Sequence, residues 1–177
     1  MNATRTKRRR FIPMPELTDE LLAVMDANSL VEDSGCIVWT GAKSRGYGNI
    51  KVSDAVMFTH RISFYRSTGV DPKEFNVDHM CFNPACLNPA HLRLVTNKQN
   101  QENRSGASKK NLSGFRGVSW HKGKSKWQVC IKHNGVGKHL GYFPTAAEAG
   151  AFAESARISL FTHNDLDRNA TNREEQR

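Results

Sequence analysis

The fold is organised around the stretch VDHMCFNPACLNPAHLRLVTNKQNQEN, residues 77–103 of a 177-residue chain. Two kinds of metal-binding side chain are interleaved in it. Thiol and imidazole groups favour zinc, whereas carboxylate and amide oxygens favour harder cations such as Mg²⁺. Six residues supply these groups: Asp78, His79, Cys81, Cys86, His91 and Asn100. We therefore predict two adjacent sites, one for structural zinc and one that uses a hard divalent metal.

The zinc site is predicted from the spacing Cys81-x4-Cys86-x4-His91. Structural zinc takes four such ligands in a closed tetrahedron, and Cys36 is the other thiol in this half of the chain. Four cysteines in a chain without an export signal more often bind metal than form disulfides. The alternative is that Cys36 is a small buried apolar side chain and that the other three ligands are a coincidence.

The second site is predicted from Asp78, His79 and Asn100. A carboxylate and an amide oxygen suit Mg²⁺, and a neutral imidazole beside them can take a proton from water. With a phosphodiester bound, these groups would support metal-assisted hydrolysis. An Asp-His pair alone is a weak signal for such chemistry.

The charge balance favours a nucleic acid partner. Lys and Arg number 26 against 17 Asp and Glu, a net charge of +9 that suits double-stranded DNA. No apolar run is long enough to span a bilayer, and the basic residues 1–10 lack the apolar stretch of a secretory signal. We expect a cytoplasmic protein with no membrane partner and no small-molecule organic cofactor.

Hydrophobic periodicity predicts an α+β chain of two units. In the first unit we expect helices over residues 15–28, 61–68 and from 96, and strands over 36–40, 47–52, 57–62, 75–80 and 92–95. Lys43 and Arg45 lie in a glycine-containing turn between two of these strands and are candidate DNA contacts. Thr96 and Gln99 match a capping box at the start of the third helix.

The second unit is predicted as a small three-stranded antiparallel sheet packed on one helix. The strands are expected over 116–120, 126–133 and 136–143 and the helix over 145–161, with a strong hairpin signal at Asn134-Gly135. The expected boundaries are a basic arm at 1–14, a first domain at 15–103, a linker at 104–113, the sheet-and-helix domain at 114–163 and a polar, fraying tail at 164–177.

The motif around His79 resembles a known nuclease family. His79, Cys81, Cys86, His91 and Asn100 stand at offsets 0, +2, +7, +12 and +21. This spacing resembles the HNH (ββα-metal) nucleases, and most closely the Cys-His box homing endonucleases and related phage HNH proteins. Trp39-Thr-Gly41, Tyr47-Gly48 and His60-Arg61 also look like the phage members.

The resemblance implies a role for each residue. His79 would be the general base, Asp78 and Asn100 the Mg²⁺ ligands, and Arg61 the arginine that braces the scissile phosphate. The zinc ligands would be Cys36, Cys81, Cys86 and His91. His91 occupies the place of the central Asn that orients the base in other HNH enzymes, so another group, such as a backbone carbonyl, must hold the His79 ring.

The second unit carries a run of cations with no acid. Residues 114–143 contain Arg116, Lys122, Lys124, Lys126, Lys132 and Lys138, with tryptophans and histidines interleaved. A basic three-stranded sheet can lay one face into a DNA groove. The alternative is a solvated sheet surface; Trp127 itself is better explained as core against the helix.

The same unit resembles the plant ethylene-response-factor (APETALA-type) DNA-binding domain. The resemblance rests on Phe115-Arg-Gly-Val-Ser-Trp120, Lys126-Trp127, Leu140-Gly-Tyr-Phe143 and Thr145-Ala-Ala-Glu-Ala-Gly-Ala-Phe152. It implies that Arg116, Trp120, Lys122, Lys132 and His139 face DNA, and the adjacent Lys124 and Lys138 are further candidates. Lysine replaces several of the base-reading arginines, which favours phosphate contact over guanine reading.

Three functions are weighed on these residues. The first is an Mg²⁺-dependent HNH DNA endonuclease of the homing type, which leaves 5′-phosphate and 3′-hydroxyl ends and needs a homodimer or a second visit to cut both strands. The second is a non-catalytic, zinc-stabilised DNA-binding regulator. RNA binding is the weakest, because the sheet lacks a paired aromatic platform. Asp78, His79 and Asn100 favour the first.

Overall fold

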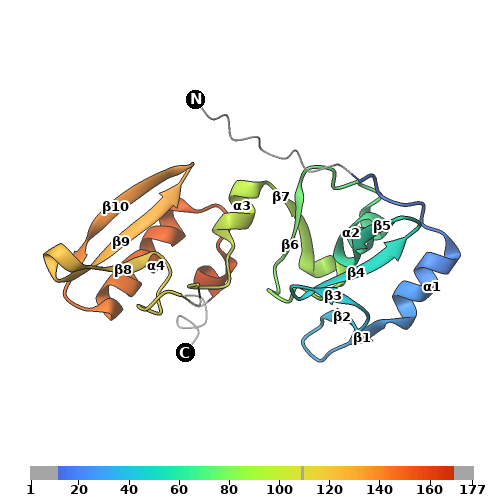
Figure 1. Ribbon diagram of the computed structural model, residues 1–177, viewed down its shortest axis with the longest axis horizontal. Coiled ribbons are helices and arrows are strands. Elements are labelled where there is room, and N and C mark those ends of the chain that lie inside the picture. The colour runs from blue at the N-terminus through green and yellow to red at the C-terminus, as the bar shows by residue number, and fades with distance from the viewer. Residues whose placement is uncertain (1–11, 109, 170–177) are drawn as a thin grey trace. The chain divides into compact units, whose positions relative to one another are not determined.

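The computed structural model describes residues 12–108 and 110–169, in which capped helices and paired strands form the elements. Most of the predicted basic arm, including Arg5–Arg10, and the end of the predicted tail lie outside these residues. In chain order the elements are α1 (Asp19–Ala27), β1 (Ser29–Val31), β2 (Ile37–Trp39), β3 (Lys43–Ser44), β4 (Tyr47–Val52), β5 (Ala55–Phe58), α2 (Thr59–Thr68), β6 (Asn76–His79), the 3₁₀ helix η1 (Pro89–His91), β7 (Leu92–Val95), α3 (Asn97–Glu102), β8 (Val118–His121), the 3₁₀ helix η2 (Lys122–Lys124), β9 (Lys126–His133), β10 (Val136–Phe143) and α4 (Ala146–Leu160) (Figure 1).

The chain divides into two units, Met1–Val95 and Thr96–Arg177. Helix α3, which the sequence analysis assigned to the first domain, therefore belongs to the second unit. Within the described residues, no helix is long and apolar enough to cross a membrane.

Helix α1 begins at Asp19, later than predicted, because Thr18 caps it. Thr18 Oγ1 accepts a hydrogen bond from the backbone N–H of Leu21 at 3.3 Å, which satisfies one of the free donors of the first turn. The buried side of the helix contributes to the main core of the first unit, which is formed by Leu21, Met25, Trp39, Met57, Ile62 and Leu87.

Helix α2 replaces residues 59–62 of the strand predicted at 57–62, and that part of the prediction is wrong. Strand β5 pairs with β4 and ends at Phe58, and the helix begins at Thr59. The buried residues Thr59, His60, Ile62 and Ser63 follow a helical rather than an alternating pattern. The helix ends as predicted at Gly69, whose φ of +69° suits glycine.

The Cys-rich stretch forms a hairpin of β6 and β7. The two strands pair antiparallel with Asp78 opposite Arg93 and His79 opposite Leu92. Helix α3 follows directly, and Thr96 and Gln99 form the predicted capping box. The strand, loop, strand and helix expected from the sequence are therefore all present in order.

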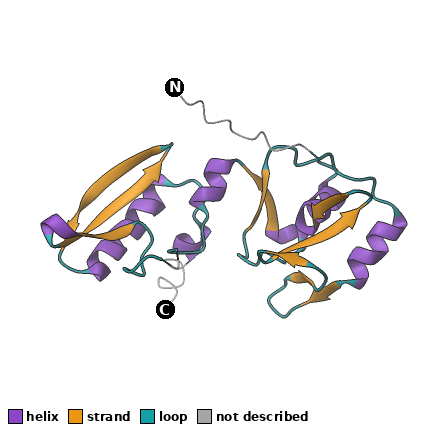
Figure 2. Cartoon of the chain, in the orientation of Figure 1, coloured by secondary structure: helices purple, strands orange, loops and turns teal. Residues whose placement is uncertain are grey.

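The second unit is a three-stranded sheet in the order β10-β9-β8 that packs on α4 (Figure 2). The hairpin between β9 and β10 turns at Asn134 and Gly135, whose φ angles of +51° and +81° suit a two-residue turn. Strand β8 begins at Val118, later than predicted, so Arg116 lies before the observed strand. The core holds Val118, Val129, Ile131, Ala149, Ala153 and Phe161.

Residues 164–169, assigned to the tail, are anchored to this unit rather than frayed. Residues 165–169 are helical, and Asn164 and Asp167 are buried. Arg157 of α4 donates to Asp167 at 2.6 Å in a buried ion pair. Such a pair holds the segment against α4, because separating it would leave a buried charge uncompensated.

Candidate active site and metal centre

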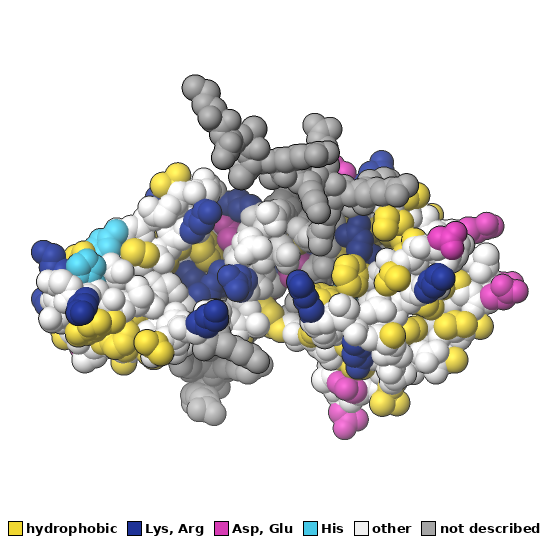
Figure 3. Space-filling view, viewed as in Figure 1, with side chains coloured by type: hydrophobic (Ala, Val, Ile, Leu, Met, Phe, Trp, Pro, Cys, Tyr) yellow, Lys and Arg dark blue, Asp and Glu magenta, His cyan; other side chains and the backbone are white. Residues whose placement is uncertain are grey.

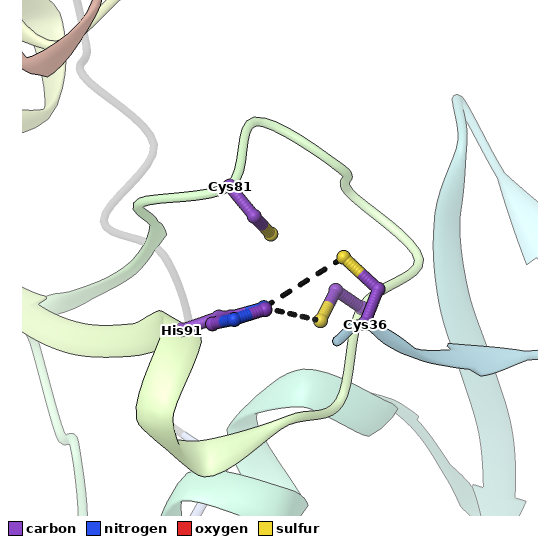
Figure 4. Close-up of side chains that lie close together, drawn as sticks. Cys36, Cys81 and His91 are labelled. Carbon is purple, nitrogen blue, oxygen red and sulfur yellow. Dashed lines mark hydrogen bonds between the residues drawn. The ribbon is translucent and has the colours of Figure 1, made fainter. Parts of the chain in front are cut away.

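The four predicted zinc ligands lie together. One ligand atom from each of Cys36, Cys81, Cys86 and His91 lies within 4.8 Å of the other three. Figure 4 shows Cys36, Cys81 and His91 of this group, with His91 Nδ1 3.7 Å from Cys36 Sγ. The same nitrogen is 3.6 Å from Cys86 Sγ. Because Zn–S bonds of about 2.3 Å place tetrahedral ligand atoms roughly 3.5–4 Å apart, this cluster could bind zinc.

Backbone pairing between β2 and the Cys-rich loop brings Cys36 to the other ligands. Val38 forms an isolated antiparallel bridge with Cys86. The adjacent Leu87 N–H donates to the carbonyl of Ile37 at 2.6 Å. The fourth ligand therefore depends on a contact between segments far apart in the sequence.

The thiols resist ionisation without a cation. Burial raises the pKa of the Cys86 thiol to about 12 and also raises the pKa of Cys81. The Asn88 N–H donates to Cys86 Sγ at 3.4 Å, which favours the thiolate. A bound dication would supply the remaining stabilisation and displace the thiol protons, as metal sites of this kind require.

A backbone carbonyl holds His79. The side chain is 6% exposed, and its Nε2 lies 3.1 Å from the carbonyl oxygen of Cys86. Because a carbonyl oxygen only accepts, Nε2 carries the proton and Nδ1 keeps the lone pair. Cys86 thus offers its thiol to the metal cluster and its carbonyl to His79. Burial lowers the pKa of His79, while the Cys86 carbonyl and Asp78 partly oppose that shift.

Two other rings pack against His79. The ring centroid of His60 lies 4.8 Å away and that of Tyr47 lies 5.9 Å away. Sequence reasoning gave His60 no role, although it noted the His60-Arg61 pair. A histidine at the start of a helix carries no local signal that would place it against a residue of another hairpin.

Asp78 forms an ion pair across the β6–β7 hairpin. Arg93 donates to Asp78 Oδ2 from Nη2 at 3.0 Å and from Nε at 3.2 Å. The aspartate is 7% exposed, so the carboxylate is held next to His79 inside the first unit. The pair compensates the charge of the buried carboxylate. Its predicted role as a metal ligand stays a prediction.

Arg61 and Asn100 lie on different units. Arg61 projects from α2 and donates to the carbonyls of Phe75 and Lys73, each at 2.8 Å. These bonds tie α2 to the loop before β6. Asn100 lies on α3, in the second unit. The phosphate-bracing role of Arg61 and the metal-binding role of Asn100 stay predictions.

Lys43 and Arg45 are exposed on the β3–β4 hairpin. The turn needs left-handed backbone at Arg45 (φ +51°) and Gly46 (φ +87°). A Cβ atom at Gly46 would lie 3.1 Å from the side chain of Pro84. The hairpin tip therefore packs closely on the Cys-rich loop and presents its two cations beside that loop.

Arg116 contacts the end of α3 within the second unit. Its guanidinium donates to the carbonyls of Glu102 and Gln101, both at 2.9 Å, and lies 5.4 Å from the ring centre of Phe161. Burial lowers the pKa of Arg116 to about 10. The side chain satisfies carbonyls that the helix end leaves unpaired. Its predicted DNA contact stays a prediction.

The strand register divides the other predicted DNA contacts between the two faces of the sheet. Ile131 is buried against α4, and Lys138 and Trp120 share its face by register and alternation. Lys132 and His139 lie on the opposite face. The remaining two, Lys122 and Lys124, lie on η2. Lys and Arg side chains are spread over this unit on the face shown in Figure 3.

Comparison with known proteins identifies the first motif. Residues 57–102 match the family model of the HNH endonucleases. This segment contains Asp78, His79 and three of the four zinc-site residues. The chain therefore contains an HNH endonuclease domain, and this family indicates a nuclease.

Two relatives come from Escherichia phage T7. Protein 7.7 is 41% identical over 68 residues, which are 38% of this chain and 52% of the relative. Protein 2.8 is 40% identical over 73 residues, which are 40% of this chain and 49% of the relative. The chain thus spans about half the length of the curated relatives it matches. No solved structure matches the chain.

Proposed function

We propose that the chain is a metal-dependent DNA endonuclease that leaves 5′-phosphate and 3′-hydroxyl ends. The observation that carries this proposal is the His79 ring, whose Nε2 is held by the Cys86 carbonyl at 3.1 Å. That bond leaves Nδ1 as a proton acceptor. The HNH endonuclease match over residues 57–102 supports the same activity.

In the proposed mechanism His79 is the general base. Its Nδ1 takes a proton from a water molecule in line with the departing 3′ oxygen. Asp78 and Asn100 would hold Mg²⁺, which when bound stabilises the charge that develops on the phosphate and the leaving group. The buried carboxylate of Asp78 beside His79 offers the hard oxygen that Mg²⁺ prefers. Arg61 would brace the scissile phosphate.

Zinc would have a structural role. Three sulfurs and one imidazole would close its coordination shell, which leaves no position for substrate. The ion would hold the Cys-rich loop, and with it the Cys86 carbonyl that orients His79. Zinc would therefore act indirectly, through the loop that positions His79. The catalytic metal would act on the substrate phosphate.

DNA targeting is assigned to the second unit, as its resemblance to the ethylene-response-factor domain implies. Support comes from exposed cations in a segment without acids, among them Lys122, Lys124 and Lys132. Lys43 and Arg45 would add phosphate contacts from the first unit. Homing-type cleavage of double-stranded DNA in a bacterial host cytoplasm is the setting that the resemblance and the phage relatives favour.

The test is nicking of supercoiled plasmid by the wild type and by His79→Ala, each with Mg²⁺ and with EDTA. We expect Mg²⁺-dependent conversion to open circles by the wild type and a loss of at least about 100-fold in the variant, since general bases contribute 10²–10⁴ in rate. Linear product from the outset would indicate a homodimer. Plasmid binding without cleavage by either protein would favour the regulator.

A further inference from the structure

A buried histidine next to His79 has no role in the function proposed above. His60 is 5% exposed and lies in the first turn of α2. Its ring centroid is 4.8 Å from that of His79, 5.5 Å from that of Tyr47 and 5.7 Å from that of Phe58. If packing were the whole purpose of this position in the aromatic cluster, phenylalanine or leucine could fill it equally well.

The two ring nitrogens of His60 differ. Nδ1 is fully enclosed and has no hydrogen-bond partner among the described residues. A neutral imidazole has one N–H and one lone pair. A buried N–H without an acceptor is rarer in proteins than an acceptor whose lone pair is unused. The proton of His60 therefore belongs on Nε2, which makes Nε2–H a hydrogen-bond donor on the ring that packs against His79.

The His60 ring is neutral at the pH at which DNA would be bound. Burial lowers the pKa of His60 to about 3, and the charges of His79 and Arg61 add to the effect. A neutral donor does not compete with His79 for the proton of the attacking water. It also brings no positive charge that would lower the basicity of the His79 ring.

We propose that His60 is a further catalytic residue, which donates a hydrogen bond from Nε2–H to a non-bridging oxygen of the scissile phosphate. This inference rests on the proposed nuclease function. Negative charge grows on these oxygens as water attacks, so a fixed donor binds the transition state more tightly than the ground state. Loss of one such donor typically lowers the rate about 10²–10³-fold.

Three substitutions separate the donor from packing. His60→Gln places an amide N–H near the position of Nε2, His60→Asn places one near Nδ1, and His60→Leu removes both. Single-turnover nicking and the Kd for the same plasmid would be measured for each. We expect His60→Leu and His60→Asn to slow cleavage about 100-fold with Kd within about twofold of wild type. His60→Gln should cleave at least about tenfold faster than His60→Leu.

The matched control is Ile62→Val, a buried position on the same helix. It should lower the melting temperature and leave the single-turnover rate unchanged, so a loss of rate through instability would show there. The comparison of His60→Gln with His60→Asn decides the matter even where His60→Leu is unstable. Cleavage by His60→Asn as fast as by His60→Gln, or by His60→Leu at the wild-type rate, would overturn the donor role. A wild type that does not nick with Mg²⁺ would instead overturn the nuclease function.

Discussion

His79 is positioned by the main chain rather than by a dedicated side chain. The carbonyl of Cys86 occupies its Nε2, and the thiol of the same residue belongs to the metal cluster. The Cys-rich loop itself therefore supplies the acceptor that holds the His79 ring. One residue thus couples the metal centre to the tautomer of the candidate base.

Acidification is expected to destabilise the first unit through its buried histidines. Burial lowers the pKa of His60 to about 3 and also lowers the pKa of His79. When the pH is below the ordinary histidine pKa near 6.5, the unfolded chain binds protons at these histidines and the folded chain does not. The free energy of unfolding is therefore highest, as far as these histidines are concerned, above about pH 6.5. It falls as the pH drops from about 6.5 toward 3, by up to about 1.4 kcal/mol per pH unit for His60.

Urea unfolding at about pH 7 and about pH 5 would measure this loss. The variant His60→Leu is the comparison, because it keeps His79 and the metal cluster and removes one titrating group. We expect the variant to lose less stability than the wild type over the same interval. Equal losses would contradict a buried, neutral His60.

At the scale of elements, the Cys-rich loop is the part that a bound metal would stabilise most directly. The loop between β6 and η1 contains Pro84 and ends at Pro89, the first residue of η1, and has few ladder bonds of its own. Its cluster of three thiols and an imidazole could bind zinc, and zinc binding would contribute directly to folding. The loop also carries the carbonyl that orients His79, so its order would bear on the proposed catalysis.

Removal of zinc should therefore reduce both stability and nicking. We expect one zinc ion per chain, a lower melting temperature after chelation, and loss of the ion in Cys81→Ser. The matched control is Cys130→Ser, because Cys130 is exposed on β9 and lies outside the cluster. Zinc content by a colorimetric chelator and melting by circular dichroism would check this. Full zinc content in Cys81→Ser would contradict the assigned ligand set.

Local signals account for the elements that the sequence predicted well. The capping box of Thr96 and Gln99 starts α3, and Asn134-Gly135 turns the β9–β10 hairpin, both as expected. The start of helix α2 was predicted wrongly because the strand that pairs with β4 ends at Phe58, before the predicted end at residue 62. Which residue ends that strand depends on burial against the core, and a short window of sequence does not contain this information.

At the scale of the whole molecule, the net charge of +9 predicts salt-sensitive binding to DNA. Lys132→Ala should weaken binding to all sequences alike and lower the slope of log Kd against log salt by about 1. Lys138→Ala is the matched control, because the register places Lys138 on the helix side of the same sheet. Fluorescence anisotropy over a salt series would measure both.

A loss confined to one DNA sequence would show that Lys132 reads bases rather than phosphates. Equal effects of the two substitutions would show that DNA does not discriminate between the faces of the sheet. In that case the cations of the unit act as a diffuse positive field and not as a docked surface.

The sequence by itself determined the metal-ligand motif, the strand-loop-strand-helix order around it and the hairpins and caps of the second unit. These features depend on spacing, alternation and turn chemistry within a few residues. Only the tertiary structure decided that β2 brings Cys36 to the cluster, that the Cys86 carbonyl holds His79, that His60 packs against it and that Arg116 binds the end of α3. Each of these is a contact between segments that fold together only once a shared core is formed, and the local sequence does not encode such contacts.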